Sequence, residues 1–192
     1  MQSKAGLFLL FLSFLITSHC SNGTNKEYQC ADLTKQLHHC LTSYLKSKGK
    51  NDLHKMDSLL ILTQGCDQTN SQLAWIKIDV ALAKGDLDLA MANIRFFERS
   101  YEGPDLSLKK GQVFEMMQHV DSAKNSYHDA IGGYQELQRG DSTNFSHIIG
   151  ELQATKLLNG KLAAKEKLDF YRRKYPFFEK ELDISARIID KD

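Results

Sequence analysis

Three consecutive residues, His38, His39 and Cys40, carry side chains that can ligate zinc. A structural zinc site needs about four ligands at suitable spacing, whereas consecutive residues of a helix point in different directions. His54 falls in the next predicted helix, but the sequence offers no second cluster to supply the remaining ligands. We therefore expect ordinary helix residues at these positions and no bound metal.

Motifs of catalytic and nucleotide-binding sites are missing from the sequence. It contains no HExxH, P-loop, GxSxG or dinucleotide-binding fingerprint, and its carboxylates are scattered as on solvated helix faces. The run Tyr171–Tyr175 mixes basic and aromatic residues that could contact nucleic acid or lipid, but basic residues also stabilise the C-terminal end of a helix. With 25 basic and 24 acidic residues, the chain has no strong field for nucleic acid. We expect a protein that is not an enzyme and needs no cofactor; catalytic groups converging in one pocket would support an enzyme instead.

An export signal is predicted at residues 1–19. Lys4 precedes an apolar run, Leu7–Ile16, that is broken only by Ser13. This run is shorter than the about 20 apolar residues that span a bilayer. Its length is typical of the core of a secretory signal peptide, which does not belong to the fold.

Cys20 indicates how the leader is removed. The sequence around it resembles a bacterial lipoprotein signal, in which such a cysteine is acylated and becomes the mature N-terminus. Thr17 and His19 stand where that signal usually has leucine and a small residue. Residues 20–27 are polar and would then form a flexible tether. The alternative is ordinary cleavage, for example after Ser18, which gives a soluble exported protein.

Three further cysteines, Cys30, Cys40 and Cys66, follow the leader, and export permits disulfides. Apolar residues at helical spacing predict a helix over 28–46, and the turn SKGKND separates it from a second helix over 53–62. Cys30 and Cys40 cannot pair, because ten residues of helix rise about 15 Å, beyond the reach of a disulfide. An antiparallel hairpin brings Cys30 close to Cys66, so this pair is favoured and Cys40 is expected to be buried. The alternative is that all three thiols are free.

The central stretch, residues 106–131, predicts two short helices joined by a polar turn at Gln118–Asp121. Gly111 on the first helix and Ala123 on the second let the two backbones approach closely. The residues expected to pack across this joint are Phe114, Tyr127 and Ala130. The hairpin resembles a tetratricopeptide repeat, whose motif places small and aromatic residues at these positions. The motif residues that differ are Ser107, Lys110 and Gln135, where the family has Trp, Leu and Pro.

The same pattern recurs on both sides of this hairpin. One copy lies 33 residues upstream, with Ile78 in the place of Gly111, and another lies 41 residues downstream, with Leu152 in that place. The longer second spacing leaves room for about two extra helical turns or a longer loop in Gln135–Asn144. The other matching positions are Ala81, Gly85, Ala90, Ile94 and Phe97 upstream, and Thr155, Ala164, Leu168, Tyr171 and Pro176 downstream. Three copies predict a helical solenoid; the alternative is an unrelated helical bundle.

The resemblance implies an all-α fold, built as a short right-handed solenoid of antiparallel helical hairpins. Few segments alternate with the period of a strand, so no sheet is expected. The predicted parts are a signal peptide (1–19), a tether (20–27), an N-terminal helical hairpin (28–66), three repeats (71–104, 105–137 and 145–178) and a C-terminal capping helix (179–192).

In this family the first helices of successive hairpins line a concave groove that holds a peptide or a partner helix. Carried over position by position, the resemblance implies a groove lined by Trp75, Asp79, Leu82, Leu108, Gln112, Glu115, Met116, Ile149, Gln153 and Lys156. Aromatic residues often anchor such surfaces, which makes Trp75 the expected anchor. The alternative is that the N-terminal hairpin or the C-terminal tail fills the groove. The lysines and asparagines with which some family members hold a chaperone's terminal carboxylate are missing.

The resemblance implies a non-catalytic scaffold for protein–protein interaction in the cell envelope. The architecture is similar to that of pilotins and assembly-factor lipoproteins with such repeats. The expected partner is therefore another protein of an envelope or secretion assembly, with no nucleic acid, and a lipid on Cys20 would attach the chain to the periplasmic face of the outer membrane. The alternative is a soluble secreted or periplasmic binding protein of the effector or immunity type.

Overall fold

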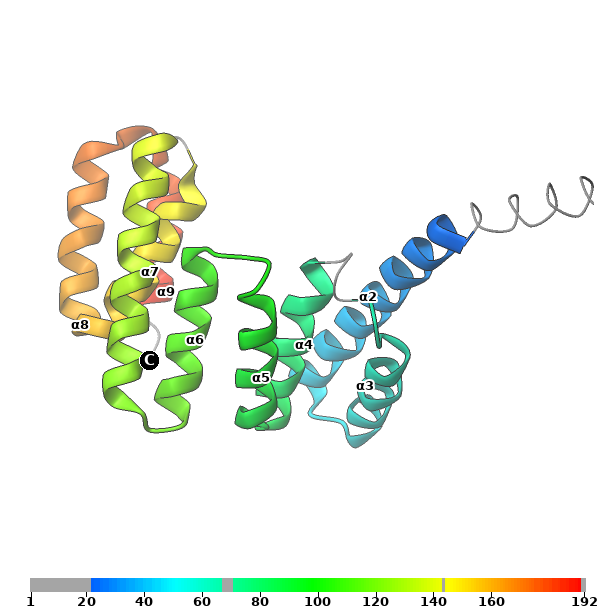
Figure 1. Ribbon diagram of the computed structural model, residues 1–192. Helices are drawn as coiled ribbons and strands as arrows, with labels where there is room; N and C mark the ends of the chain where they lie inside the picture. The colour runs from blue at the N-terminus through cyan, green and yellow to red at the C-terminus, as the bar shows by residue number, and fades with distance from the viewer. Residues whose placement is uncertain (1–21, 67–70, 143, 191–192) are drawn as a thin grey trace, which may run out of the picture. The chain divides into compact units, whose positions relative to one another are not determined.

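The computed structural model describes residues 22–66, 71–142 and 144–190, and within these ranges the chain forms helices joined by short turns, without a strand (Figure 1). The predicted all-α fold is therefore confirmed for this part of the chain. The predicted signal peptide and Cys20 lie outside the described residues. Among the described helices, none is both long enough and apolar enough to cross a bilayer. The elements are α2 (Asn22–Ser47), α3 (Lys50–Leu62), α4 (Ser71–Lys84), α5 (Leu87–Phe97), α6 (Pro104–Met116), α7 (Val120–Gly140), α8 (Phe145–Lys174), the 3-10 turn η1 (Pro176–Phe178) and α9 (Glu179–Asp190).

The chain consists of two compact units, and the boundary between them lies between Asp86 and Leu87. The first unit contains α2, α3 and α4, and the second contains α5 to α9. The boundary falls inside the predicted repeat 71–104. Helix α4 ends before Gly85, whose φ of 74° suits glycine better than other residues, and the Asp86 amide donates to the Ala81 carbonyl at 2.9 Å. The predicted turn at Gly85–Asp86 is thus present.

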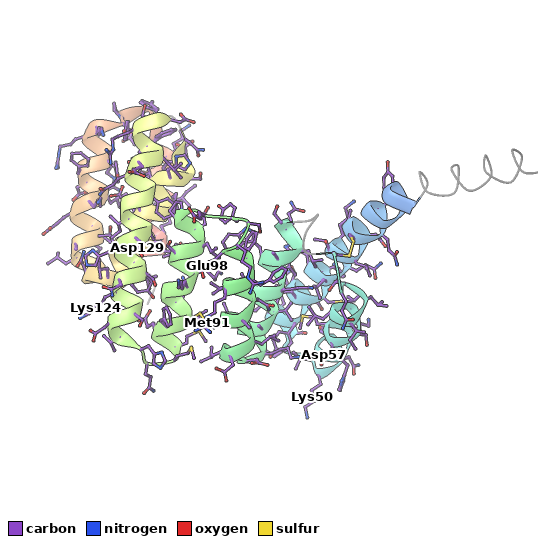
Figure 2. The ribbon with its side chains drawn as sticks, in the orientation of Figure 1. Lys50, Asp57, Met91, Glu98, Lys124 and Asp129 are labelled. Atoms are coloured by element: carbon purple, nitrogen blue, oxygen red, sulfur yellow. A yellow bond between two sulfur atoms is a disulfide. The ribbon has the colours of Figure 1, made fainter. Side chains whose placement is uncertain are left out.

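The first unit is a hairpin of α2 and α3 with α4 packed against both helices. A disulfide joins Cys30 and Cys66, whose Cα atoms are 5.7 Å apart (Figure 2). Near the turn, the Ser43 hydroxyl donates to the Asp52 carboxylate at 2.9 Å. Cys40 is a half-buried free thiol beside the core. The core residues are Cys30, Leu37, Leu41, Met56, Cys66, Leu73, Ile76 and Val80.

The predicted tether differs from the structure, because α2 already begins at Asn22. Asparagine and glycine favour turns over helix, which is why the sequence suggested a flexible segment at 20–27. However, a helix that has nucleated gains one backbone hydrogen bond for each residue added. The part of α2 that the core holds from Cys30 onward can therefore extend back through Asn22–Glu27.

The second unit is built around the hairpin of α6 and α7, which contacts α5 through α6 and α8 through both helices. Gly111 is buried on α6, and a Cβ atom added there would overlap the ring of Tyr127. Ala123 and Ala130 are buried in the same cluster, and Phe114 packs against it. The predicted close approach at Gly111 is therefore confirmed.

Helices α7 and α8 are longer than the repeat motif predicts. Helix α7 continues to Gly140, so the extra residues of Gln135–Asn144 mainly extend the helix and do not form a longer loop. Gly160 divides α8 into two arms that pack against each other (Figure 1). Its φ of 84° and ψ of 174° are accessible to glycine but strained for other residues.

A second glycine contact and the last helix complete this unit. A Cβ atom on Gly150, in the first arm of α8, would overlap the ring of Tyr134 from α7. Helix α9 packs on α8 through Leu182 and Ile189, which are both buried. The core around α9 contains Ile148, Leu152, Ala164, Leu168, Tyr171, Tyr175, Leu182 and Ile189.

Replacing Gly111 by alanine is expected to lower the free energy of unfolding by about 1–2 kcal/mol. The added methyl group would overlap the Tyr127 ring, and overpacking costs about 1–3 kcal/mol, which the helix propensity of alanine offsets by up to about 1 kcal/mol. Gly132 is the matched control, because it is exposed on α7 with no atom within 4 Å of an added Cβ. Gly132→Ala should stabilise the protein by about 0.5–1 kcal/mol. Urea unfolding followed by circular dichroism measures both, and an equal gain from both substitutions would contradict this packing.

Candidate functional site

The α8–α9 depression is a hollow of about 250 Å³ between the first arm of α8 and helix α9. Its α8 residues recur every three or four positions, so they form one face of that helix. Ser185 and Ile189 come from α9 and are about one turn apart. The lining residues are Ile149, Leu152, Gln153, Lys156, Leu157, Ser185 and Ile189.

Helix α9 forms one side of the depression because apolar contacts and ion pairs hold it on α8. The Asp183 carboxylate pairs with Arg172 at 2.8 Å, and Asp190 pairs with Lys165 at 2.6 Å. The side chains of these pairs are largely exposed to water, which screens their attraction, so the pairs contribute little to stability. The buried Leu182 and Ile189 therefore supply most of the stabilisation of this contact.

The depression combines an aliphatic interior with polar groups at its edge. Leu152 and Ile189 are buried, whereas Ile149 is half-buried and Gln153 is exposed. The hollow is smaller than the about 300–1,000 Å³ of a typical small-molecule pocket. It therefore fits one or two apolar side chains of a partner better than it fits a cofactor.

Three predicted groove residues, Ile149, Gln153 and Lys156, line this depression together. Two others on α6 are accessible without lining it: Met116 is 52% exposed and Gln112 is half-buried. The second unit thus brings part of the predicted set into one hollow. The α9 residues of the lining, Ser185 and Ile189, are not part of the predicted groove.

Leu108 was predicted to line the groove, but its side chain is buried in the structure. Only 7% of it is exposed, so a partner could not contact it. It belongs to a core cluster with Tyr127 and Ala154. Helix α6 contacts α5, α7 and α8, so its apolar residues are buried on several sides and the exposed face is narrow. Glu115 is exposed at the end of the helix, but it accepts a hydrogen bond from the Tyr127 hydroxyl at 2.6 Å.

The remaining predicted groove residues, Trp75, Asp79 and Leu82, lie on α4 in the first unit. Each of them is half-buried. None of the three lines the α8–α9 depression of the second unit. The depression is consequently formed by α8 and α9 residues alone.

A buried carboxylate network lies on the first arm of α8. Glu151 is fully buried, and four side chains contact its two oxygens. The Gln138 amide donates to it at 2.7 Å and the Gln135 amide at 2.8 Å. The Tyr171 hydroxyl and the Lys167 ammonium group complete the set. The repeat pattern includes Gln135 and Tyr171, but no motif in the sequence indicates Glu151.

The ionisation of Glu151 follows from these contacts. Burial by itself raises the pKa of Glu151, because it removes water from the charged form. The hydrogen bonds from Lys167, Tyr171, Gln135 and Gln138 outweigh burial and hold the pKa below its ordinary value. Both carboxylate oxygens are therefore charged and occupied, which suits a structural role and leaves no accepting position for the proton of a substrate.

Tyrosine hydroxyls contact carboxylates at two further places in the second unit. Tyr127 donates to Glu115 at 2.6 Å, and Tyr134 donates to Asp105 at 2.6 Å. Burial raises the pKa of both tyrosines, and the neighbouring carboxylate raises it further. Both hydroxyls consequently remain protonated donors at neutral pH.

The structure also places the two other groups that the sequence singled out, the possible metal ligands and the run Tyr171–Tyr175. In the part of the chain that the structure describes, no cluster of three or more His, Cys, Asp or Glu side chains could hold a metal ion. Within the run Tyr171–Tyr175, Arg172 pairs with Asp183 at 2.8 Å. The Lys174 ammonium group lies 4.9 Å from the centre of the Tyr175 ring. The basic side chains of this run are thus partly engaged inside the second unit.

The sequence matches no protein-family model, and comparisons with curated proteins and with solved structures give no match either. The resemblance to tetratricopeptide repeats therefore depends on the sequence pattern of this chain alone.

Proposed function

We propose that the protein is a non-catalytic scaffold of the cell envelope that binds a peptide or helix of a partner protein, with the α8–α9 depression as its anchor pocket. One observation carries this proposal. Ile149, Gln153 and Lys156, which the repeat pattern assigns to a binding groove, line a single hollow. An apolar interior with polar groups at the edge is the composition of a protein interface.

The arrangement of the second unit supports a repeat-like architecture. Consecutive helices pack as neighbours from α5 to α8, and α6 also contacts α8. A glycine lies under a tyrosine ring in each of two successive contacts, Gly111 under Tyr127 and Gly150 under Tyr134. Repeated close contacts of this kind are expected when similar hairpins stack on one another.

The envelope location rests on the predicted leader and on cysteine usage. A disulfide between Cys30 and Cys66 suits an oxidising compartment outside the cytosol. Acylation of Cys20 would attach the chain to the outer membrane, and cleavage elsewhere in the leader would leave it soluble in the periplasm or outside the cell. Both locations place the depression where it can meet exported proteins.

Site-specific crosslinking tests the proposed surface. A photoreactive residue at Gln153, the exposed edge of the depression, is expected to crosslink one partner protein in the native cells. The same residue at Lys124, which is exposed on α7 (Figure 2), should not. Adding Ile149→Asp to the Gln153 variant should weaken the crosslink strongly, because loss of an anchor costs about 2 kcal/mol of binding. Equal crosslinking from Gln153 and Lys124, or no effect of Ile149→Asp, would contradict the proposal.

A further inference from the structure

A second hollow, the α2–α3 cleft, lies in the first unit and has a volume of about 680 Å³. Each helix contributes four residues to the lining. They are two consecutive residues and the two consecutive residues that lie one helical turn further along, so they share one face of the helix. The cleft therefore runs along matching faces of the hairpin. Its lining residues are Lys35, Gln36, His39 and Cys40 from α2, and His54, Lys55, Ser58 and Leu59 from α3.

The charged residues that line this cleft are all basic. Lys35 and Lys55 are cationic, His39 and His54 carry ring N–H donors, and no lining residue is acidic. Among the described residues, none of these four side chains forms a hydrogen bond or an ion pair. Such positive groups without a protein partner attract an anion from solution.

Three aspartates of the same hairpin already have side-chain partners. Asp32 accepts a hydrogen bond from the Gln36 amide at 2.7 Å. Asp52 accepts from Ser43 at 2.9 Å near the turn. Asp57 pairs with Lys84 of α4. Each of these three carboxylates therefore has a partner other than the two lysines that line the cleft.

The cleft is also held in shape and has an apolar floor. The Cys30–Cys66 disulfide ties α2 to the end of α3, and Asp52 ties the two helices near the turn. Cys40 and Leu59 pack against the core of the unit, so the floor is continuous with buried apolar residues. A preformed cleft loses less entropy on binding than a flexible one.

We propose that the α2–α3 cleft binds a small ligand in which a carboxylate or phosphate group is attached to an apolar body. Lys35 and Lys55 contact the oxyanion, His39 and His54 donate hydrogen bonds to it, and the apolar body lies on Cys40 and Leu59. The volume is within the about 300–1,000 Å³ range of small-molecule sites. This site belongs to the first unit and does not depend on the α8–α9 depression.

Titration of the isotope-labelled protein with three probes of similar size tests the site. Benzoate supplies a carboxylate, phenyl phosphate supplies a phosphate, and benzyl alcohol has the same ring without a charge. At least one anion is expected to shift the amide signals of α2 and α3 saturably, with benzyl alcohol binding about tenfold more weakly or worse, since hydrogen bonds to charged groups contribute about 1.5–3 kcal/mol. A response to only one anion identifies the oxyanion group of the ligand. Saturation by neither anion, or equal binding of benzyl alcohol, would overturn the proposal.

Charge reversal locates the site. Lys35→Glu with Lys55→Glu is expected to weaken anion binding by about tenfold or more. The matched control is Lys46→Glu with Lys50→Glu, which changes the net charge equally outside the lining; Figure 2 shows Lys50 by the turn. Equal loss from both pairs would mean a general charge effect and no site. If the first pair unfolds the protein, Lys35→Met with Lys55→Met removes the charges, keeps the apolar stems and is expected to weaken binding in the same way; unchanged binding would overturn the proposal.

Discussion

Replacing Glu151 by alanine is expected to destabilise the second unit by about 3–5 kcal/mol, the cost of removing one partner of a buried ion pair. The substitution leaves the Lys167 ammonium group without its partner and removes the acceptor of the Gln138 and Gln135 amides. It also removes an acceptor of the Tyr171 hydroxyl. Urea unfolding followed by hydrogen exchange in α7 and α8 measures the loss.

Two further substitutions separate charge from packing. Lys167→Met added to Glu151→Ala should recover part of the stability, because the half-buried Lys167 ammonium group is then no longer left without its partner. Glu151→Gln keeps the shape and one acceptor oxygen, so it should cost less than Glu151→Ala. Equal losses for Glu151→Ala with and without Lys167→Met would show that the ion pair contributes little.

The contacts of Glu151 also predict how the stability of the protein depends on pH in the acidic range. Because the folded-state pKa of Glu151 lies below its ordinary value of 4.5, its stabilising contribution is complete above that value. It is lost as the pH falls from 4.5 through the folded-state pKa. Glu151→Gln should therefore flatten the fall in stability over this acidic range, and an identical fall in both proteins would contradict the assignment.

Removing the disulfide, with Cys30→Ala and Cys66→Ala together, is expected to lower stability by about 3–4 kcal/mol. The bridge spans a sequence separation of 36 residues, so its loss greatly increases the freedom of the unfolded chain. The double substitution also prevents a remaining thiol from pairing with Cys40. The bridge ties α2 to the chain just after α3, and residues 87–192 contain no cysteine. The increase in amide exchange should therefore be concentrated in α2 and α3.

Reduction of the native protein gives an independent measurement. Dithiothreitol should reproduce the effect of the double substitution and should have no effect on the double variant. Cys40→Ala is the control, because it removes a half-buried thiol that forms no bridge and should cost about 1 kcal/mol or less. Faster exchange spread evenly over α2 to α9 would contradict a local role of the disulfide.

Helix positions and the disulfide could be predicted because they depend on local residue types and helix geometry. The turn at Gly85 follows from glycine itself, and Cys30 pairs with Cys66 because of the hairpin. The environment of Glu151 could not be predicted in this way. It is one of 24 acidic residues, and its partners Gln138 and Tyr171 lie 13 and 20 residues away in the chain.

Of the two helices that line the α8–α9 depression, only α8 could be assigned to a binding surface from the sequence. Ile149 and Gln153 could be placed from the repeat pattern, because they share a face of one helix. The α9 side could not, since this helix carries isoleucines on more than one face: Ile189 is 4% exposed, whereas Ile184 is 58% exposed. Leu108 shows the opposite error, because the motif cannot indicate that α6 contacts three other helices.

The tyrosine hydroxyls of the second unit also determine which movements it can make. Asp105 lies in the first turn of α6 and Glu115 in the last, so Tyr134 and Tyr127 fasten α7 to both ends of α6. Sliding of α7 by a single residue would shift it about 1.5 Å and strain both hydrogen bonds together. Shear between these two helices is therefore opposed at both ends of α6, so a change in the shape of the α8–α9 depression has to come from side-chain rotation or from movement of α9 on α8.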